Sequence, residues 1–259
     1  MPFGIGPFRE KVVLPNAFGI DEDEAKSPIE RELAEGCVRI HYQPIVDVKS
    51  RKIFAYEGLL RSTSQRFRTP PDMIAAAVER GIIGQLGRLM RQLAVKNCPD
   101  AVLFINLVPN EFNEGWLVRP DDPIFWHQES VYLEITESVP LSHFELCHSV
   151  LQEIRGKGCF LAVDDLGAGF SNIKYIADLS PEIVKLDRNL IAGLTKNSRQ
   201  QLLVRQLVRL CSEMGARVVA EGVETLEELH AVIDTGTTFV QGFLMARPAP
   251  SPPPVTWPE

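Results

Sequence analysis

Cysteine and histidine are scarce in this chain, with five residues of each among 259. The cysteines are scattered along the sequence, at Cys37, Cys98, Cys147, Cys159 and Cys211, and none forms a CxxC pair. This spacing indicates neither a disulfide framework nor a thiolate zinc site, and it favours a reducing, cytoplasmic location. Because the histidines show no HExxH spacing, a zinc hydrolase is also disfavoured.

Long apolar runs and excess positive charge are lacking as well. No stretch approaches the roughly eighteen apolar residues of a membrane span, and no long apolar region follows a basic start at the N-terminus, so we expect neither secretion nor membrane insertion. The formal net charge of −7 argues against non-specific binding to a nucleic acid polymer, although a local basic patch could still receive a phosphate.

The chain is long enough for two ordinary domains or for one large α/β barrel. Residues 1–30 are punctuated by proline and glycine and then acidic, which predicts an N-terminal arm, or a partly disordered leader, that runs into a short helix at IERELAEG. Residues 251–259 are too proline-rich for a helix or central strand, so we expect an extended tail there. A single barrel domain is expected over 31–250.

Apolar, β-rich runs alternate with helical patterns between the arm and the tail. Strands are expected at VRIHYQPIVDV, KIFAYEGLLRS, AVLFINLV, VYLEIT, CFLAVDD, EIVKLD, ARVVAEG and TFVQGF. Helices are expected near 71–80, 84–97, 140–156, 170–179, 198–214 and 225–234. The first two strands are close enough in sequence to form an antiparallel hairpin.

Strict alternation of strand and helix predicts a parallel sheet, and eight strands match a closed barrel better than two separate domains. We therefore expect an α/β fold, a TIM-like (β/α)8 barrel whose first strand is antiparallel. An open, doubly wound sheet is the alternative.

Polar residues interrupt most of these strands, and they lie at or near the C-terminal ends, except Glu57, whose strand continues through Arg61. The set comprises Glu57, Asn106, Glu134, Asp164, Asp165, Lys185, Asp187, Glu221 and Gln241. The C-terminal strand ends of a parallel barrel meet on one face, where active sites are built. Any one of these residues could instead be a solvated charge or a helix N-cap, but their coincidence favours a site.

The stretch LAVDDLGAGF places two aspartates side by side. Neighbouring strand residues point to opposite faces, so Asp164 and Asp165 are expected to converge only if the strand ends there. Several carboxylates with only one lysine and one arginine need a compensating cation, and an oxygen-only set suits Mg²⁺ or Mn²⁺. Adjacent aspartates can bridge two such ions for in-line attack on a phosphoryl group.

Two basic residues accompany the acids. Lys185 could orient or help deprotonate the attacking water, or it could be an ion-pair partner that balances charge. Arg61, on the same strand face as Glu57, suits a phosphodiester oxygen, with a surface salt bridge as the alternative.

Seven motifs, YEGLLR, FINL, LEITES, VDDLGAGFSN, VKLD, AEGVET and QGF, occur in the order and spacing of EAL domains, so the chain resembles cyclic di-GMP phosphodiesterases over residues 36–250. The resemblance implies a barrel with an antiparallel strand, two Mg²⁺ or Mn²⁺ ions, and hydrolysis of cyclic di-GMP to linear pGpG. It also implies a homodimer formed through helices next to the LGAGFSN loop.

The resemblance implies individual roles as well. It implies that one ion is bound by Glu57, Asn106, Glu134 and Asp164, with Asp164 shared and Asp165 on the second ion. Glu221 resembles a glutamate near the attacking water, and Lys185 resembles the lysine that contacts this water. Substrate contacts, or less defined roles around the site, are implied for Gln43, Arg61, Asp187 and Gln241. The resemblance assigns Glu137, Gly167, Gly169 and Glu224 to the mobile loop and to its coupling with the dimer.

Some positions depart from the family pattern. The signature tripeptide is EGL, with Gly58 in place of alanine, and the loop has Leu166 and Ala168 where phenylalanine and threonine are frequent. Every expected metal ligand is retained, so loop coupling and turnover are more in question than metal binding. Two alternatives stay open: a non-hydrolytic cyclic di-GMP receptor that acts through a protein partner, and another divalent-metal barrel enzyme.

Overall fold

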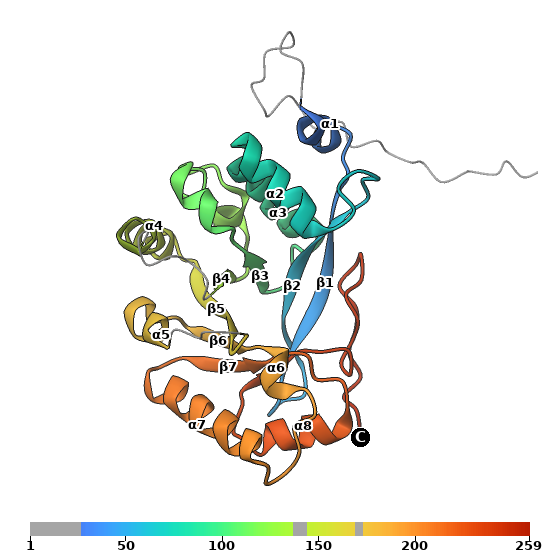
Figure 1. The fold of residues 1–259 in the computed structure, drawn as a ribbon, viewed down its shortest axis with the longest axis vertical. Helices are drawn as coiled ribbons and strands as arrows, with labels where there is room; N and C mark the ends of the chain where they lie inside the picture. The colour runs from blue at the N-terminus through green and yellow to red at the C-terminus, as the bar shows by residue number, and fades with distance from the viewer. Residues whose placement is uncertain (1–26, 137–143, 169–172) are drawn as a thin grey trace, which may run out of the picture.

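Eight strands close in chain order into a barrel in the computed structural model, which describes residues 27–136, 144–168 and 173–259 (Figure 1). The strands are β1 Val38–Asp47, β2 Ile53–Ser62, β3 Leu103–Asn106, β4 Val131–Thr136, β5 Phe160–Leu166, β6 Ile183–Leu186, β7 Arg217–Ala220 and β8 Phe239–Val240. Strands β2 to β8 pair in parallel, whereas β1 is antiparallel to both β2 and β8. The expected TIM-like barrel with an antiparallel first strand is confirmed.

Helices follow the strands and lie on the outside of the barrel. They are α1 Pro28–Ala34, α2 Pro70–Arg80, α3 Ile83–Asn97, α4 Phe144–Gly156, α5 Lys174–Leu179, α6 Arg188–Ile191, α7 Arg199–Glu213 and α8 Leu226–Ile233. Two 3₁₀ turns, η1 Pro109–Asn113 and η2 Pro123–Trp126, occupy a segment for which the sequence indicated no regular structure. The helix pattern is therefore close to the expected one, with the short α6 added.

Local sequence explains where several helices begin. Thr69 caps α2 and Thr225 caps α8 through capping boxes with Asp72 and Glu228, and Pro70 supplies the fixed φ of a first helical turn. Gly81 ends α2 with φ of 72°, a left-handed conformation that glycine adopts at little cost.

One layer of apolar side chains fills the barrel interior. Each strand contributes one residue, namely Ile45, Ala55, Phe104, Tyr132, Ala162, Ile183, Val219 and Phe239. The rings of Phe104 and Tyr132 stack with centroids 4.5 Å apart, and Phe54, which packs against the layer, stacks on Phe239 at 4.2 Å. The polar residues of the next layer lie directly above this apolar layer.

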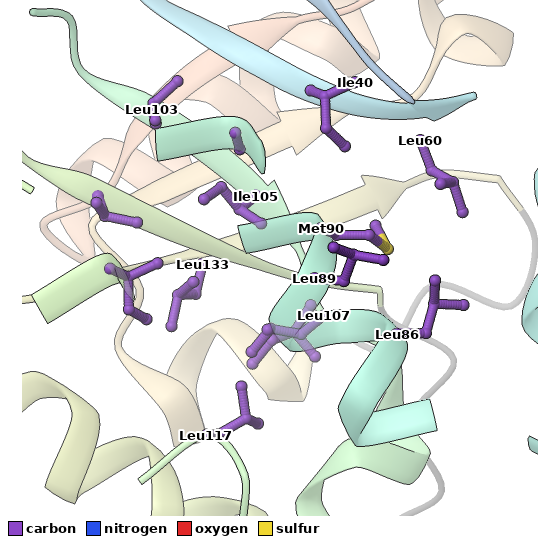
Figure 2. Close-up of a cluster of buried hydrophobic side chains, with 14 of the residues drawn as sticks. Ile40, Leu60, Leu86, Leu89, Met90, Leu103, Ile105, Leu107, Leu117 and Leu133 are labelled. Atoms are coloured by element: carbon purple, nitrogen blue, oxygen red, sulfur yellow. The ribbon is translucent and has the colours of Figure 1, made fainter. Parts of the chain in front are cut away.

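The outer faces of the strands carry two further apolar clusters. One joins β1–β5 to α1–α4, and Figure 2 shows its side chains from the strands meeting Leu86, Leu89 and Met90 of α3. The other joins β5–β8 to α5–α8 and contains Val184, Val218 and Leu229. Alternate residues of one strand thus face helices and barrel interior, as the period of two requires.

The C-terminal segment, expected to be an extended tail, contacts the barrel. Residues 1–26 of the expected arm lie outside the described part, while its short helix is α1. The C-terminal segment runs alongside β1 (Figure 1), where Tyr42 and Ala249 exchange backbone hydrogen bonds of 2.7 and 3.1 Å. Among the described helices, none is both long enough and apolar enough to cross a membrane.

Candidate metal centre

A ring of polar side chains lies one pleat above the apolar layer. Its members are Gln43, Glu57, Asn106, Glu134, Asp164, Lys185, Glu221 and Gln241, one from each strand or from the residue directly after it. Each lies two residues from the apolar-layer residue of the same strand, toward the C-terminal face of the barrel. Because strand side chains repeat with a period of two, the ring faces the barrel axis.

Lys185 is the centre of this ring, with only 1 % of its surface exposed. Its Nζ lies 2.6 Å from Glu134 Oε1, 2.7 Å from Glu221 Oε1, 3.2 Å from Glu57 Oε2 and 3.3 Å from Asp164 Oδ1. The four acids raise the pKa of Lys185 well above its usual range, against the opposing effect of burial. Lys185 therefore stays charged, and a single ammonium holds four carboxylates together.

Amide side chains complete the contacts of Glu57. Asn106 Nδ2 donates to Glu57 Oε1 at 3.0 Å, and Gln241 Nε2 donates to Glu57 Oε2 at 2.7 Å. Gln43 joins the ring through a contact of 3.4 Å with Gln241 and a hydrogen bond of 3.2 Å to the Ala246 carbonyl. Glu57 is thus fixed from both sides of the barrel. Burial opposes its ionisation, but Lys185 and the amides still lower its pKa below the usual value.

The aspartate doublet is shaped by a bulge, which corrects one expectation. The strand does not stop at the doublet, because β5 continues to Leu166. Instead, the pairing of β5 with β6 shifts register between Val163 and Leu166, and Asp165 adopts a positive φ of 61°. A bulge with one left-handed residue re-aims the side chain, so Asp164 and Asp165 converge while the strand continues.

Burial and mutual repulsion raise the pKa values of several acids in this structure. The pKa of Asp165 is raised to about 6, by burial and then by Asp164 and Asp187. The pKa of Glu221 is raised to about 8, chiefly by burial, and that of Glu134 is raised well above the usual range by burial and by Glu57. One lysine therefore does not compensate all the acids of the ring.

The donor set fits hard divalent cations. Ligand oxygens of Asp164, Asp165 and Glu221 lie within 4.8 Å of one another. Glu134 Oε2 is buried and receives no hydrogen bond from any residue that the structure describes. Such an oxygen is costly to bury unless a cation contacts it, and carboxylate and amide oxygens are the preferred ligands of Mg²⁺ and Mn²⁺.

Other predicted residues lie outside the ring. Asp187 caps α6 by accepting from the Asn189 N–H at 2.9 Å, and Glu224 pairs with Arg188 at 2.8 Å. Arg61 lies farther along β2 and donates to the Leu60 carbonyl. Arg188 is not among the residues predicted from the sequence, although its position directly after Asp187 is a signal for it.

The loop residues are only partly described. Gly167 has φ of 105°, and a Cβ there would lie 2.4 Å from Leu190 Cδ1, so this position requires glycine. Glu137 and Gly169 lie outside the described residues, and their expected roles in loop coupling stay predictions.

Comparison with known families places this ring of residues in context. A family model for the EAL domain matches residues 27–248. The chain belongs to the EAL domain family. A protein from Sinorhizobium fredii, y4lL, is 32 % identical over 236 residues, which are 87 % of this chain and 28 % of that protein. The cyclic di-GMP phosphodiesterase PA2567 of Pseudomonas aeruginosa is 30 % identical over 220 residues, 80 % of this chain and 38 % of that protein.

Solved EAL structures share the fold. Klebsiella pneumoniae BlrP1 in complex with manganese and cyclic di-GMP at pH 6 is 28 % identical with a TM-score of 0.72, covering 85 % of this chain and 58 % of that one. The PaMucR phosphodiesterase in complex with cyclic di-GMP is 27 % identical with a TM-score of 0.73, covering 83 % and 97 %. This EAL domain spans about a third of the length of the curated relatives it matches.

Proposed function

We propose that this EAL domain hydrolyses cyclic di-GMP to linear pGpG with two divalent cations, Mg²⁺ or Mn²⁺. The observation that carries the proposal is the buried ring, in which four carboxylates meet one lysine and Glu134 Oε2 has no hydrogen-bond donor within the described part of the chain. Relatives whose structures contain cyclic di-GMP with manganese or calcium support the choice of ligand and of metal.

The residues in and beside the ring would have two roles: some would bind the cations, and others would position the binding side chains. Glu57, Asn106, Glu134 and Asp164 would hold one cation, and Asp165 the second, with Asp164 shared. When bound, the cations would activate water and neutralise charge on the scissile phosphodiester. Asn106 and Gln241 orient Glu57, while the ammonium of Lys185 lies 2.7 Å from Glu221 and favours the anionic forms of the acids around the water.

Residues around the ring would bind the rest of the substrate. Gln43, Arg61, Asp187 and Gln241 are the proposed substrate-contacting positions. Glu137, Gly167, Gly169 and Glu224 are the proposed positions of the loop and its coupling to the dimer. We further propose that the domain forms a homodimer in the cytoplasm that can couple to a regulatory protein partner.

A product assay tests the proposal directly. Purified protein is incubated with cyclic di-GMP and Mg²⁺ or Mn²⁺, with and without EDTA, and the products are separated by chromatography. We expect pGpG that disappears with the chelator. Binding without cleavage in either metal would favour the receptor alternative instead.

A matched pair of variants tests the site. Asp164→Asn keeps the side-chain shape but removes a shared ligand, so we expect it to abolish pGpG formation. Asp121→Asn makes the same chemical change in a surface pair with Arg88 of α3 and should leave turnover unchanged. Near-normal turnover in purified Asp164→Asn protein would refute the assignment of the ring as the catalytic centre.

A further inference from the structure

The β1–β2 hairpin projects beyond the mouth of the barrel. Gly58 of β2 lies opposite Ile105, so the last residue of β3, Asn106, is level with Leu59. Pairing within the hairpin continues for three more residues of β2, up to the Val38–Ser62 pair, which is about 10 Å of strand. The end of the hairpin is therefore a wall beside the polar ring, and Figure 1 shows β1 and β2 as the long strands that extend toward α1.

The inner face of this wall is cationic. Gln43 and Glu57 are opposite each other in the ring, and the next residues on the same face are His41 opposite Leu59 and then Arg39 opposite Arg61. The alternate residues Val38, Ile40 and Leu60 point to the outer cluster. Parity therefore places both arginines on the side of the wall that faces the site.

Arg39 and Arg61 form a like-charged cross-strand pair without a counter-ion. Directly opposed Cβ atoms in an antiparallel pair lie about 4.5–5.5 Å apart, and like charges there are destabilising. Neither guanidinium forms an ion pair with any carboxylate of the described residues. Within the described residues, their hydrogen bonds go to backbone carbonyls, Gly36 and Val38 for Arg39 and Leu60 for Arg61, so most of their N–H donors have no partner in this part of the chain.

His41, beside the pair, supports the same conclusion. Its pKa is lowered first by burial and then by the charge of Arg61, against a hydrogen bond to the Pro248 carbonyl. The positive charge of Arg61 therefore reaches His41 on the same face of the wall. In a chain with 34 acidic and 27 basic residues, an uncompensated arginine pair at the mouth of a metal site is a place for a ligand anion.

We propose that Arg39 and Arg61 together bind the second, non-scissile phosphodiester of the cyclic dinucleotide whose first phosphodiester lies over the acidic ring. The inference rests on the proposed function and adds Arg39 to it. Arg61 is four residues from Glu57, about 13 Å along the strand, and its long side chain can reach across part of that distance. Two guanidinium groups on one phosphodiester supply paired N–H donors and remove the repulsion between them.

Equilibrium binding tests the pair. Binding of cyclic di-GMP is measured by calorimetry in Ca²⁺, the ion in one BlrP1 complex, for wild type, Arg39→Gln and Arg61→Gln. Each variant should bind about 10- to 100-fold more weakly, the loss expected for a hydrogen bond to a charged group, with a smaller salt dependence. In steady-state hydrolysis, Arg39→Gln should raise KM more than it lowers kcat, because the contact is made equally in ground and transition states.

Lys49→Gln is the matched control, since it removes one positive charge from the exposed turn at the opposite end of the same hairpin. It should bind like wild type. If Arg39→Gln also binds like wild type, the inference is overturned while the proposed function stands. If wild type neither binds nor hydrolyses cyclic di-GMP, both fall.

Thermal stability of the ligand-free protein separates binding from folding. Removing one of two opposed arginines relieves repulsion, so Arg39→Gln should have a Tm equal to or above that of wild type. Weaker binding accompanied by a marked loss of Tm would assign Arg39 a structural role and would contradict the inference.

Discussion

Single side chains at the polar ring have properties that depend on their neighbours. Asp165 reaches the ring only because its backbone is left-handed within a bulge, and Lys185 is charged in a buried site only because four acids surround it. Such strained or buried groups persist where the surrounding structure compensates for them. The ring is therefore a unit, and changing one member changes the energetics of the others.

Replacing Lys185 tests this dependence. Lys185→Met removes the ammonium and leaves four buried carboxylates without their shared partner, so the metal-free protein should lose about 3–5 kcal/mol of unfolding free energy. Urea unfolding in EDTA measures the loss, and added Mg²⁺ should restore part of it. Lys196→Met, which breaks an exposed pair with Asp234, should change stability by less than about 0.5 kcal/mol. Equal stability of Lys185→Met and wild type in EDTA would contradict the central role of Lys185.

The raised pKa values predict a pH dependence. Asp165 has a pKa of about 6 and Glu221 of about 8, above ordinary values of 3.8 and 4.5, so the metal-free folded protein binds protons that the unfolded chain has released. The stability these groups contribute is fully present below about pH 4 and is lost as pH rises through 6 to 8.

Cations displace the same protons, so the gain in Tm from Mg²⁺ should be larger at pH 8 than at pH 6. Thermal scans with Mg²⁺ or with EDTA across this range measure the gain, and Asp164→Asn should show little gain at either pH. A magnesium effect independent of pH in wild type would show that these acids are not the ligands.

At the scale of elements, two glycine positions differ in whether they have room for a larger side chain. Gly58, the departure from the family tripeptide, faces the outer cluster, and a Cβ there would lie 3.4 Å from Ile40 and 3.5 Å from Ala94. These are ordinary contact distances. At Gly242, after β8, a Cβ would lie 2.0 Å from the Val223 carbonyl oxygen, which is backbone and cannot yield.

The two alanine substitutions should therefore act in opposite directions. Gly58→Ala should stabilise the protein by about 0.5–1 kcal/mol, because a strand glycine loses more entropy on folding than alanine. Gly242→Ala should destabilise it and displace Gln241 from Glu57. Tm and turnover of both variants check this, and a destabilised Gly58→Ala would mean that the strand cannot accept the methyl group.

At the scale of the whole molecule, the C-terminal segment packs against the antiparallel hairpin of the closed barrel. The family match ends at residue 248, but the chain continues along β1. Tyr56 donates its hydroxyl hydrogen bond to the Pro253 carbonyl at 3.0 Å, and Val255 and Trp257 pack against the cluster that contains Val46. This segment is thus part of the folded domain.

Truncation tests that role. Removing residues 250–259 should lower the unfolding free energy by roughly 1–3 kcal/mol, the value of burying one or two large apolar side chains, without changing which product forms. Removing only Pro258 and Glu259, beyond Trp257, is the control and should have little effect. An unchanged Tm after the longer truncation would show that the packing contributes nothing to stability.

Alternation of apolar strands and helical patterns determined the barrel from sequence alone, because burial of both sheet faces requires that pattern. The sequence also identified Glu57, Asn106, Glu134 and Asp164, since a polar residue two positions beyond an apolar strand residue is visible as a period of two. It also predicted that Asp165 would converge with Asp164, but through the end of the strand and not through the bulge that the structure shows.

Only the tertiary structure decided how the ring is assembled. The β5 bulge, the four contacts of Lys185 and the opposition of Arg39 to Arg61 all depend on register between strands that are distant in sequence. Local sequence specifies which face a side chain occupies, but register and pKa depend on groups that only the closed barrel brings together. The packing of the C-terminal segment could not be predicted for the same reason, because its composition indicates only an extended chain and its contacts with Tyr42 and Tyr56 form in the folded barrel.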